Sequence, residues 1–249
     1  MTQSTTEIHT APRTDVIRDQ GGFRTAFDFP GRNLPGHDDH GYGPLATVVE
    51  SVLDPGTLIG MHPHRNEEII SWVPAGVMRH DDREGNRLVT DPESLLVMNA
   101  GSGFWHEERT TDDDPPLRML QIFVRPRELD LEPGIQHGPV PDPTSGEWRH
   151  LFGPEGSGAP FSVRNDVDLY DVRLERGRET ELPAMAGRDA YVYVFEGEIG
   201  VGDARLGQGE SALLVGGGSE PIRATEESVV VAFLIDPDAP VTRQGTIGR

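Results

Sequence analysis

The chain has 249 residues, 42 of them acidic and 22 basic, which gives a net charge of −20, and every basic residue is arginine. This charge repels nucleic-acid phosphates and anionic membrane surfaces, so we expect neither as a partner. The lack of cysteine excludes thiol nucleophiles, iron–sulfur clusters and disulfides, while the lack of lysine excludes Schiff-base chemistry and the phosphate-binding P-loop.

Hydrophobicity along the chain gives no sign of a membrane or export segment. No apolar run approaches the roughly 18 residues that a bilayer-spanning helix needs. Residues 1–15 contain no basic segment followed by an apolar core, as a secretory signal would. We therefore expect a cytoplasmic protein.

Short apolar segments rich in Val, Leu and Ile recur along the chain, bounded by Gly, Pro and Asp, as is typical of β-strands. They fall into two series, the first over 45–53, 67–73, 94–100 and 117–124 and the second over 168–175, 190–201, 211–218 and 228–235. No long amphipathic helix stands between them. The pattern predicts an all-β protein, built as a sandwich or barrel.

Between the two series lies a segment, residues 131–146, that contains four prolines. Proline-rich stretches with few apolar residues are typical of domain boundaries. We therefore predict an N-terminal unit over 1–130, a linker over 131–146 and a C-terminal unit over 147–249.

The nine histidines indicate where chemistry could take place, because none follows position 150. Alternate side chains of a strand share a face, so His62 and His64 should point the same way, as should His106 and Glu108. If the two strands meet inside one barrel, they offer three imidazoles and one carboxylate to a divalent ion. Four ligands leave two positions of a six-coordinate ion open, as a catalytic metal requires.

A structural interpretation stays open beside this one. The segment "HPH" at 62–64 could form a surface turn, and "HEE" at 106–108 could be solvated polarity at a strand end. His80, beside Asp81 and Asp82, is interpreted as a solvated or structural histidine at a turn.

Several motifs resemble those of the pirin family over about residues 20–125. Gly56, the histidine pair, Glu68 and Gly76 are spaced as in the first cupin motif. The pirin-like features are "HPHR" at 62–65, the turn "DDREGN" at 81–86 and "AGSGFWHEE" at 100–108. Where family members often have Gly-Phe after the first of these, this chain has Asn66-Glu67.

The resemblance implies a bicupin, two double-stranded β-helix barrels with one mononuclear metal in the N-terminal barrel. That metal is commonly Fe(II), and such sites also accept Ni, Cu, Mn, Co or Zn. The ligands carried over from the motifs are His62, His64, His106 and Glu108. Many other cupins use a first-motif carboxylate, which here would be Glu68; the pirin-like second motif favours Glu108 and leaves Glu68 as a hydrogen-bonding or substrate-facing residue. Gln121 matches a glutamine common in this strand of the family, which could line the pocket or could equally satisfy its own buried polarity.

The activity implied by the resemblance is that of quercetin 2,3-dioxygenase, ring cleavage of a flavonol or another enolic or phenolic substrate with O2. Glu108 would act as the base. The partners would then be a small-molecule substrate and O2. Nuclear pirins imply an alternative, a non-enzymatic redox-sensing module that binds a protein partner.

Overall fold

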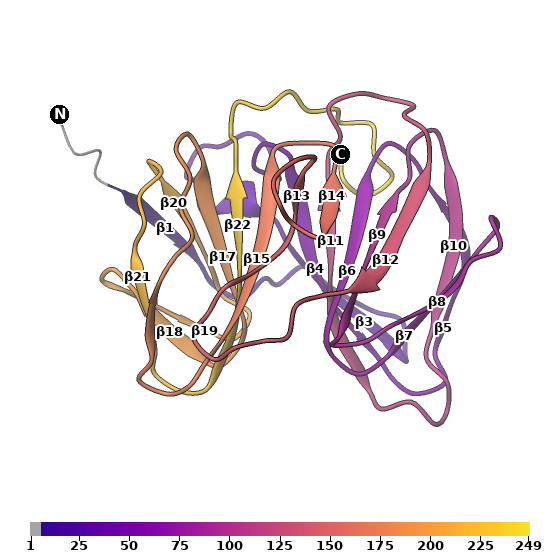
Figure 1. Cartoon of the computed structure of the whole chain (residues 1–249), viewed down its shortest axis with the longest axis horizontal. Helices are drawn as coiled ribbons and strands as arrows, with labels where there is room; N and C mark the ends of the chain where they lie inside the picture. Colours follow the sequence, from indigo (N-terminus) through magenta and orange to yellow (C-terminus); the bar gives the residue numbers. More distant parts are fainter. Residues whose placement is uncertain (1–5) are drawn as a thin grey trace.

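The computed structural model describes residues 6–249 and consists almost wholly of β-strands (Figure 1). The one helical element among these residues is the short 3-10 turn η1 (Pro30–Asn33). The predicted all-β class is therefore confirmed. Across the same residues no helix is long and apolar enough to span a bilayer. The first five residues of the predicted N-terminal unit, 1–5, lie outside the described residues.

The first barrel is a sandwich of a seven-stranded sheet, in the order β12-β9-β6-β11-β4-β3-β2, and a four-stranded sheet, in the order β5-β10-β7-β8. Its strands are β2 (Ile17–Asp19), β3 (Phe23–Asp28), β4 (Leu45–Leu53), β5 (Leu58–His64), β6 (Glu68–Ala75), β7 (Met78–Asp82), β8 (Arg87–Thr90), β9 (Ser94–Asn99), β10 (Phe104–Arg109), β11 (Leu117–Val124) and β12 (Gly134–Pro139).

The second barrel repeats this architecture with the sheet orders β1-β20-β17-β22-β15-β13-β14 and β16-β21-β18-β19. Its strands are β1 (Glu7–Ala11), β13 (Arg149–Pro154), β14 (Phe161–Val163), β15 (Val167–Leu174), β16 (Glu179–Glu181), β17 (Asp189–Glu196), β18 (Glu198–Val201), β19 (Ala204–Gly207), β20 (Ser211–Val215), β21 (Pro221–Ala224) and β22 (Ser228–Ile235).

The two seven-stranded sheets face each other across a shared apolar core (Figure 1). This core includes Ile70 and Trp72 from β6 and Tyr191 and Phe195 from β17, and the Trp72 and Phe195 rings meet edge to face at 5.1 Å between centroids. Each barrel also has an apolar core of its own. Because the strands of these sheets are buried on both faces, their sequences are nearly continuous apolar runs, which made them easy to recognise.

Two segments join sheets other than those expected. β1, placed by the sequence in the first unit, pairs antiparallel with β20 of the second barrel. β12 lies within the predicted linker 131–146 and pairs antiparallel with β9 of the first barrel. Each is the outermost strand of its seven-stranded sheet and pairs with backbone groups of β20 or β9 that would otherwise lie at the edge. The prediction of a linker over all of 131–146 is thus corrected, since proline at the end of an edge strand is compatible with pairing.

Candidate metal site and its cavity

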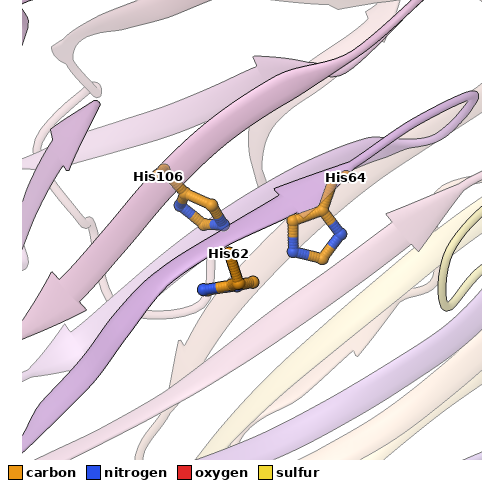
Figure 2. A group of neighbouring side chains, drawn as sticks. All are labelled: His62, His64 and His106. Atoms are coloured by element: carbon orange, nitrogen blue, oxygen red, sulfur yellow. The ribbon is translucent and has the colours of Figure 1, made fainter. Parts of the chain in front are cut away.

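Three histidines from two neighbouring strands gather in the first barrel. His62 on β5 lies directly opposite His106 on β10, and His64 lies opposite Phe104. The potential ligand atoms of the three histidines all lie within 4.8 Å of one another. Figure 2 shows the three rings converging, two from one strand and one from the next. The face-sharing that strand geometry predicts for His62 and His64 therefore brings both to the same site as His106.

Hydrogen bonds at Nδ1 orient the two histidines of β5. The Nδ1–H of His62 donates to the carbonyl oxygen of Gly60 at 2.8 Å. The Nδ1–H of His64 donates to Oε1 of Glu67 at 2.5 Å. With Nδ1 protonated, the neutral ring leaves Nε2 as a bare lone pair, which is the form that ligates a metal.

A relay of hydrogen bonds does the same for His106. Asp82 is held by the backbone N–H and the side-chain amide of Asn86 at 2.9 and 2.8 Å. It accepts from Nε2 of His80 at 3.2 Å, so Nδ1 of His80 is free to accept from Nδ1 of His106 at 3.3 Å. The turn "DDREGN" thereby sets the tautomer of His106 through His80.

The remaining nitrogen of His106, Nε2, is buried and has no hydrogen-bond partner among the described residues. Nearly all buried polar atoms in proteins have such a partner, so an orphaned one calls for an explanation. A metal ion is a chemically suitable partner, because the nitrogen is a lone-pair donor beside two others. The residues present therefore fit the cofactor that the sequence motifs predict.

Burial favours the neutral form of His62, His80 and His106. It lowers the pKa of His106 to about 2, with a further contribution from the neighbouring His62, His64 and His80. Burial also lowers the pKa values of His62 and His80. At neutral pH the imidazoles need not lose a proton before they bind a metal.

Glu108 lies beside this group on β10 but is oriented by Gln121. The side-chain amide of Gln121 donates to both carboxylate oxygens of Glu108, at 2.8 and 2.7 Å. Burial raises the pKa of Glu108 to about 7. Oε1 of Glu108 is 3.9 Å from Nδ1 of His106, and the close grouping of Glu108 is with His80 and His106 rather than with His62 and His64. Its role as a fourth ligand stays a prediction.

The site opens into a cavity of about 150 Å³. Half of its fourteen lining residues are aromatic or aliphatic, and His62, His64, Glu108 and Gln121 also line it. The other lining residues are Arg18, Gln20, Phe23, Thr25, Phe27, Val49, Ile59, Ile69, Phe123 and Ile247. Gln121 thus lies in the wall where the family motif places it. Sequence reasoning missed the contributions of β2 and β3 and of Ile247, which no local pattern marks.

Glu68 is not among the residues that line this cavity; it makes hydrogen bonds, which is one of its two predicted roles, and its contact with substrate stays a prediction. Its carboxylate accepts from the side-chain amide of Asn99 at 2.5 Å and from the backbone N–H of Arg164, in the second barrel, at 2.6 Å. Between His64 and Glu68 the chain leaves one sheet and enters the other, and Asn66 adopts a left-handed φ of 53° at this corner. Positions 62, 64 and 68 are separated by even numbers of residues, but alternation holds only within one strand. Glu68 therefore does not share a face with His62 and His64.

Two further residues differ from their sequence interpretation. His80 is fully buried and contacts His106, so the solvated alternative is wrong and the structural one holds. Glu67 is also fully buried and bonds to His64, a role that the sequence did not predict. The one feature of the sequence that could have indicated this role is the replacement of the family's Gly-Phe by Asn66-Glu67. Asn66 takes the glycine position because asparagine tolerates the left-handed conformation.

The fold and this histidine group define a bicupin with a candidate metal site in its first barrel. The family model for pirin matches residues 36–124, and the model described as the quercetinase C-terminal cupin domain matches residues 151–235. The chain belongs to the pirin family, and its quercetinase-like relatives share both barrels.

The individual relatives are distant. A quercetin 2,3-dioxygenase of Escherichia coli strain K12 is 23% identical over 197 residues, which cover 79% of this chain and 84% of the relative. A bacterial pirin from Escherichia coli, solved in complex with nickel(II), superposes with a TM-score of 0.78 at 20% identity, covering 92% of this chain and 99% of that one. A quercetin 2,3-dioxygenase from Acinetobacter baumannii gives 0.77 at 20% identity, with 93% and 86% covered. At this identity the superpositions establish the fold.

Proposed function

We propose that the protein is a metal-dependent dioxygenase that cleaves a ring of a flavonol or of a related enolic or phenolic compound, as its quercetinase-like relatives are named for doing. The observation that carries the proposal is the buried Nε2 of His106, which has no hydrogen-bond partner among the described residues and belongs to a group of three histidines, two of which, His62 and His64, line the cavity.

His62, His64 and His106 would hold the ion, with Glu108 as the fourth ligand. We infer Fe(II) as the physiological metal, because three imidazoles and one carboxylate suit a non-haem iron. When bound, the ion supplies a Lewis-acidic, redox-active centre with open positions for substrate oxygen and O2.

Glu108 and Gln121 would handle the substrate proton. An enolic or phenolic hydroxyl that enters the cavity can donate to a carboxylate oxygen of Glu108, which then takes the proton as a general base. Gln121 holds that carboxylate in one orientation through both of its oxygens. A fixed base contributes more than a mobile one, because no orientation has to be found during the reaction.

The cavity wall favours a flat, largely apolar substrate. Phe23 and Phe27 from β3 and Phe123 from β11 offer ring faces and edges, and burial of aromatic surface there is favourable. Arg18 stacks on Phe27, 4.7 Å from its ring centroid, and supplies a positive charge at the rim. An ionised enol or phenol would be stabilised by that charge.

Oxygen uptake tests the proposal. Protein purified anaerobically and loaded with Fe(II) should consume O2 when quercetin is added, and His106→Ala should abolish uptake. Glu107→Gln is the matched control, because Glu107 is adjacent on β10 but turned away from the site toward Arg109. If the loaded protein consumes no O2 with quercetin or with simpler enols and phenols, the dioxygenase proposal fails and the non-enzymatic module is favoured.

A further inference from the structure

The last ten residues, 240–249, here called the tail, leave the second barrel and lie against the first (Figure 1). The backbone N–H of Thr242 donates to the carbonyl of Pro126 at 3.1 Å, and the backbone N–H of Arg65 donates to Oγ1 of Thr246 at 3.0 Å. Arg125, fully buried, donates to the carbonyl oxygen of Arg249 at 3.0 Å. The tail is therefore anchored at several points beside the metal site.

Glu67 joins the tail to the metal site. Its Oε1 accepts from Nδ1 of His64 at 2.5 Å. Its Oε2 accepts from the backbone N–H groups of Ile247 and Gly248 at 2.8 and 2.7 Å. One fully buried carboxylate thus holds a candidate metal ligand with one oxygen and two consecutive tail amides with the other.

Two glycines permit this close approach. A Cβ atom at Gly245 would lie 2.8 Å from Oε2 of Glu67, and one at Gly248 would lie 3.3 Å from both that oxygen and Cβ of Ala46. A side chain at position 245 would therefore force the carboxylate or the tail to shift, and one at position 248 would be tightly packed against Glu67 and Ala46. The sequence of the tail is therefore suited to binding Glu67.

The tail also limits the size of the cavity. A second cavity of about 310 Å³ lies beside the first, and Arg18, Phe27 and Ile247 line both. Sites for small molecules commonly measure about 300–1,000 Å³, so the 150 Å³ beside the histidines is small for an aromatic substrate. Movement of Ile247 would join the two spaces.

We propose that Glu67 is a positioning residue that couples the tail to His64, so that a docked tail fixes this ligand and Ile247 forms a movable wall of the substrate site. A histidine ligand depends on the partner of its other nitrogen for orientation and basicity. If the tail leaves, Oε2 of Glu67 loses both donors and the carboxylate can rotate away from His64. Metal binding and tail docking must then strengthen each other by the same factor.

Amide exchange tests the coupling in the intact protein without turnover. Saturating nickel(II) should slow hydrogen–deuterium exchange at residues 247 and 248 by about fivefold to a hundredfold. Glu67→Gln should remove that protection and weaken nickel binding, measured by chelator competition, by about tenfold to a hundredfold. One amide has a single acceptor oxygen, so it cannot serve both His64 and the tail. Glu107→Gln, the control, should change neither quantity.

The outcomes separate this inference from the proposed function. If nickel binds while exchange at 247 and 248 stays unchanged, the coupling is overturned, and this measurement on the wild-type protein decides even if Glu67→Gln folds poorly. If the coupling is found but quercetin gives no oxygen uptake, the coupling stands and the dioxygenase proposal fails.

The proposal that Ile247 forms a movable wall of the substrate site rests on the proposed function, and a separate experiment tests it. Anaerobic binding of quercetin to the nickel-loaded protein should be tighter in Ile247→Ala and weaker in Ile247→Trp than in the wild type. Equal affinities in all three would overturn the wall while leaving the link between Glu67 and the tail intact.

Discussion

The two barrels share one strand order but differ in what their inner faces carry. In the first, β5 and β10 place His62 opposite His106. In the second, the corresponding strands β16 and β21 place Thr180 opposite Ile222. Ile222 and Ala224, which lie on the same face of β21, are both buried in the apolar core of the second barrel. The same strand arrangement can therefore occur with or without a ligand site. A few inward-pointing side chains decide whether a barrel binds a ligand or only supports the fold.

The largest expected effect comes from removing a nitrogen of the histidine group. His106→Ala should lower bound iron or nickel from near one per chain to near zero, because the remaining ligands no longer surround the ion. Elemental analysis of the purified variants measures this. The counterpart in the other barrel, Ile222→Ala, should keep its metal and lose about 2–5 kcal/mol of unfolding free energy through the cavity it creates. Metal retained in His106→Ala would contradict the assigned site.

Gln121→Leu should lower the rate of oxygen uptake with quercetin by about tenfold to a hundredfold, because Glu108 loses both hydrogen bonds that orient it. Gln136→Leu is the matched control, since Gln136 is an amide that bonds to Asn99 and Ser162 away from the cavity. It should affect stability and leave uptake unchanged. Equal loss of activity in both variants would remove the special role of Gln121.

A smaller effect concerns the pH dependence of stability in the metal-free protein. Burial raises the pKa of Glu68 to about 7 from an ordinary value of 4.5. The folded state then binds the proton of Glu68 more tightly than the unfolded state does. This tighter binding stabilises the fold by up to about 3 kcal/mol; the stabilisation is complete below pH 4.5 and is lost as pH rises through 7. Urea unfolding across this range should show a flatter profile for Glu68→Gln than for the wild type. The surface variant Glu128→Gln should keep the wild-type slope, and a wild-type slope in Glu68→Gln would refute the assignment.

The smallest expected effect lies between the barrels. Tyr193 of the second barrel donates to Oε2 of Glu50 in the first at 2.8 Å, while Arg118 also binds Glu50 at 3.0 Å. Tyr193→Phe should therefore cost about 1.5 kcal/mol of unfolding free energy, the low end for a hydrogen bond to a charged group, because Glu50 keeps Arg118 as a charged partner. Urea unfolding measures the loss, and metal content should not change. The control is Tyr170→Phe, at a partly exposed tyrosine, which should lose less unfolding free energy. A larger loss in Tyr170→Phe than in Tyr193→Phe would contradict the stabilising role assigned to the bond between Tyr193 and Glu50.

Much of the fold was predictable because the central strands are long, apolar and buried on both faces. The predicted segments 45–53 and 117–124 coincide with β4 and β11. The short edge strands β1 and β12 were missed, since their pairing depends on a distant partner rather than on their own pattern.

In the candidate site, too, the residues placed by a local strand pattern were predictable and those placed by distant parts of the chain were not. Alternation along a single strand correctly placed His62 with His64 and His106 with Glu108 on buried or cavity-lining faces. The same rule failed at Glu68, where the chain turns into another sheet after Asn66. Ile247 was beyond the reach of any local pattern, because it comes to the cavity from the far end of the chain.

The pairing of β1 with β20 has a consequence for how the protein is made. Residues 7–11 precede the first barrel in the chain, yet the strand that they join spans 211–215, about 200 residues later. During translation β1 therefore stays unpaired until the whole first barrel and most of the second have been synthesised. Such long-range closure slows folding, because a large loop has to be ordered before the contact contributes. The second barrel therefore can be completed only after the first has been synthesised, because β1 precedes the first barrel in the chain.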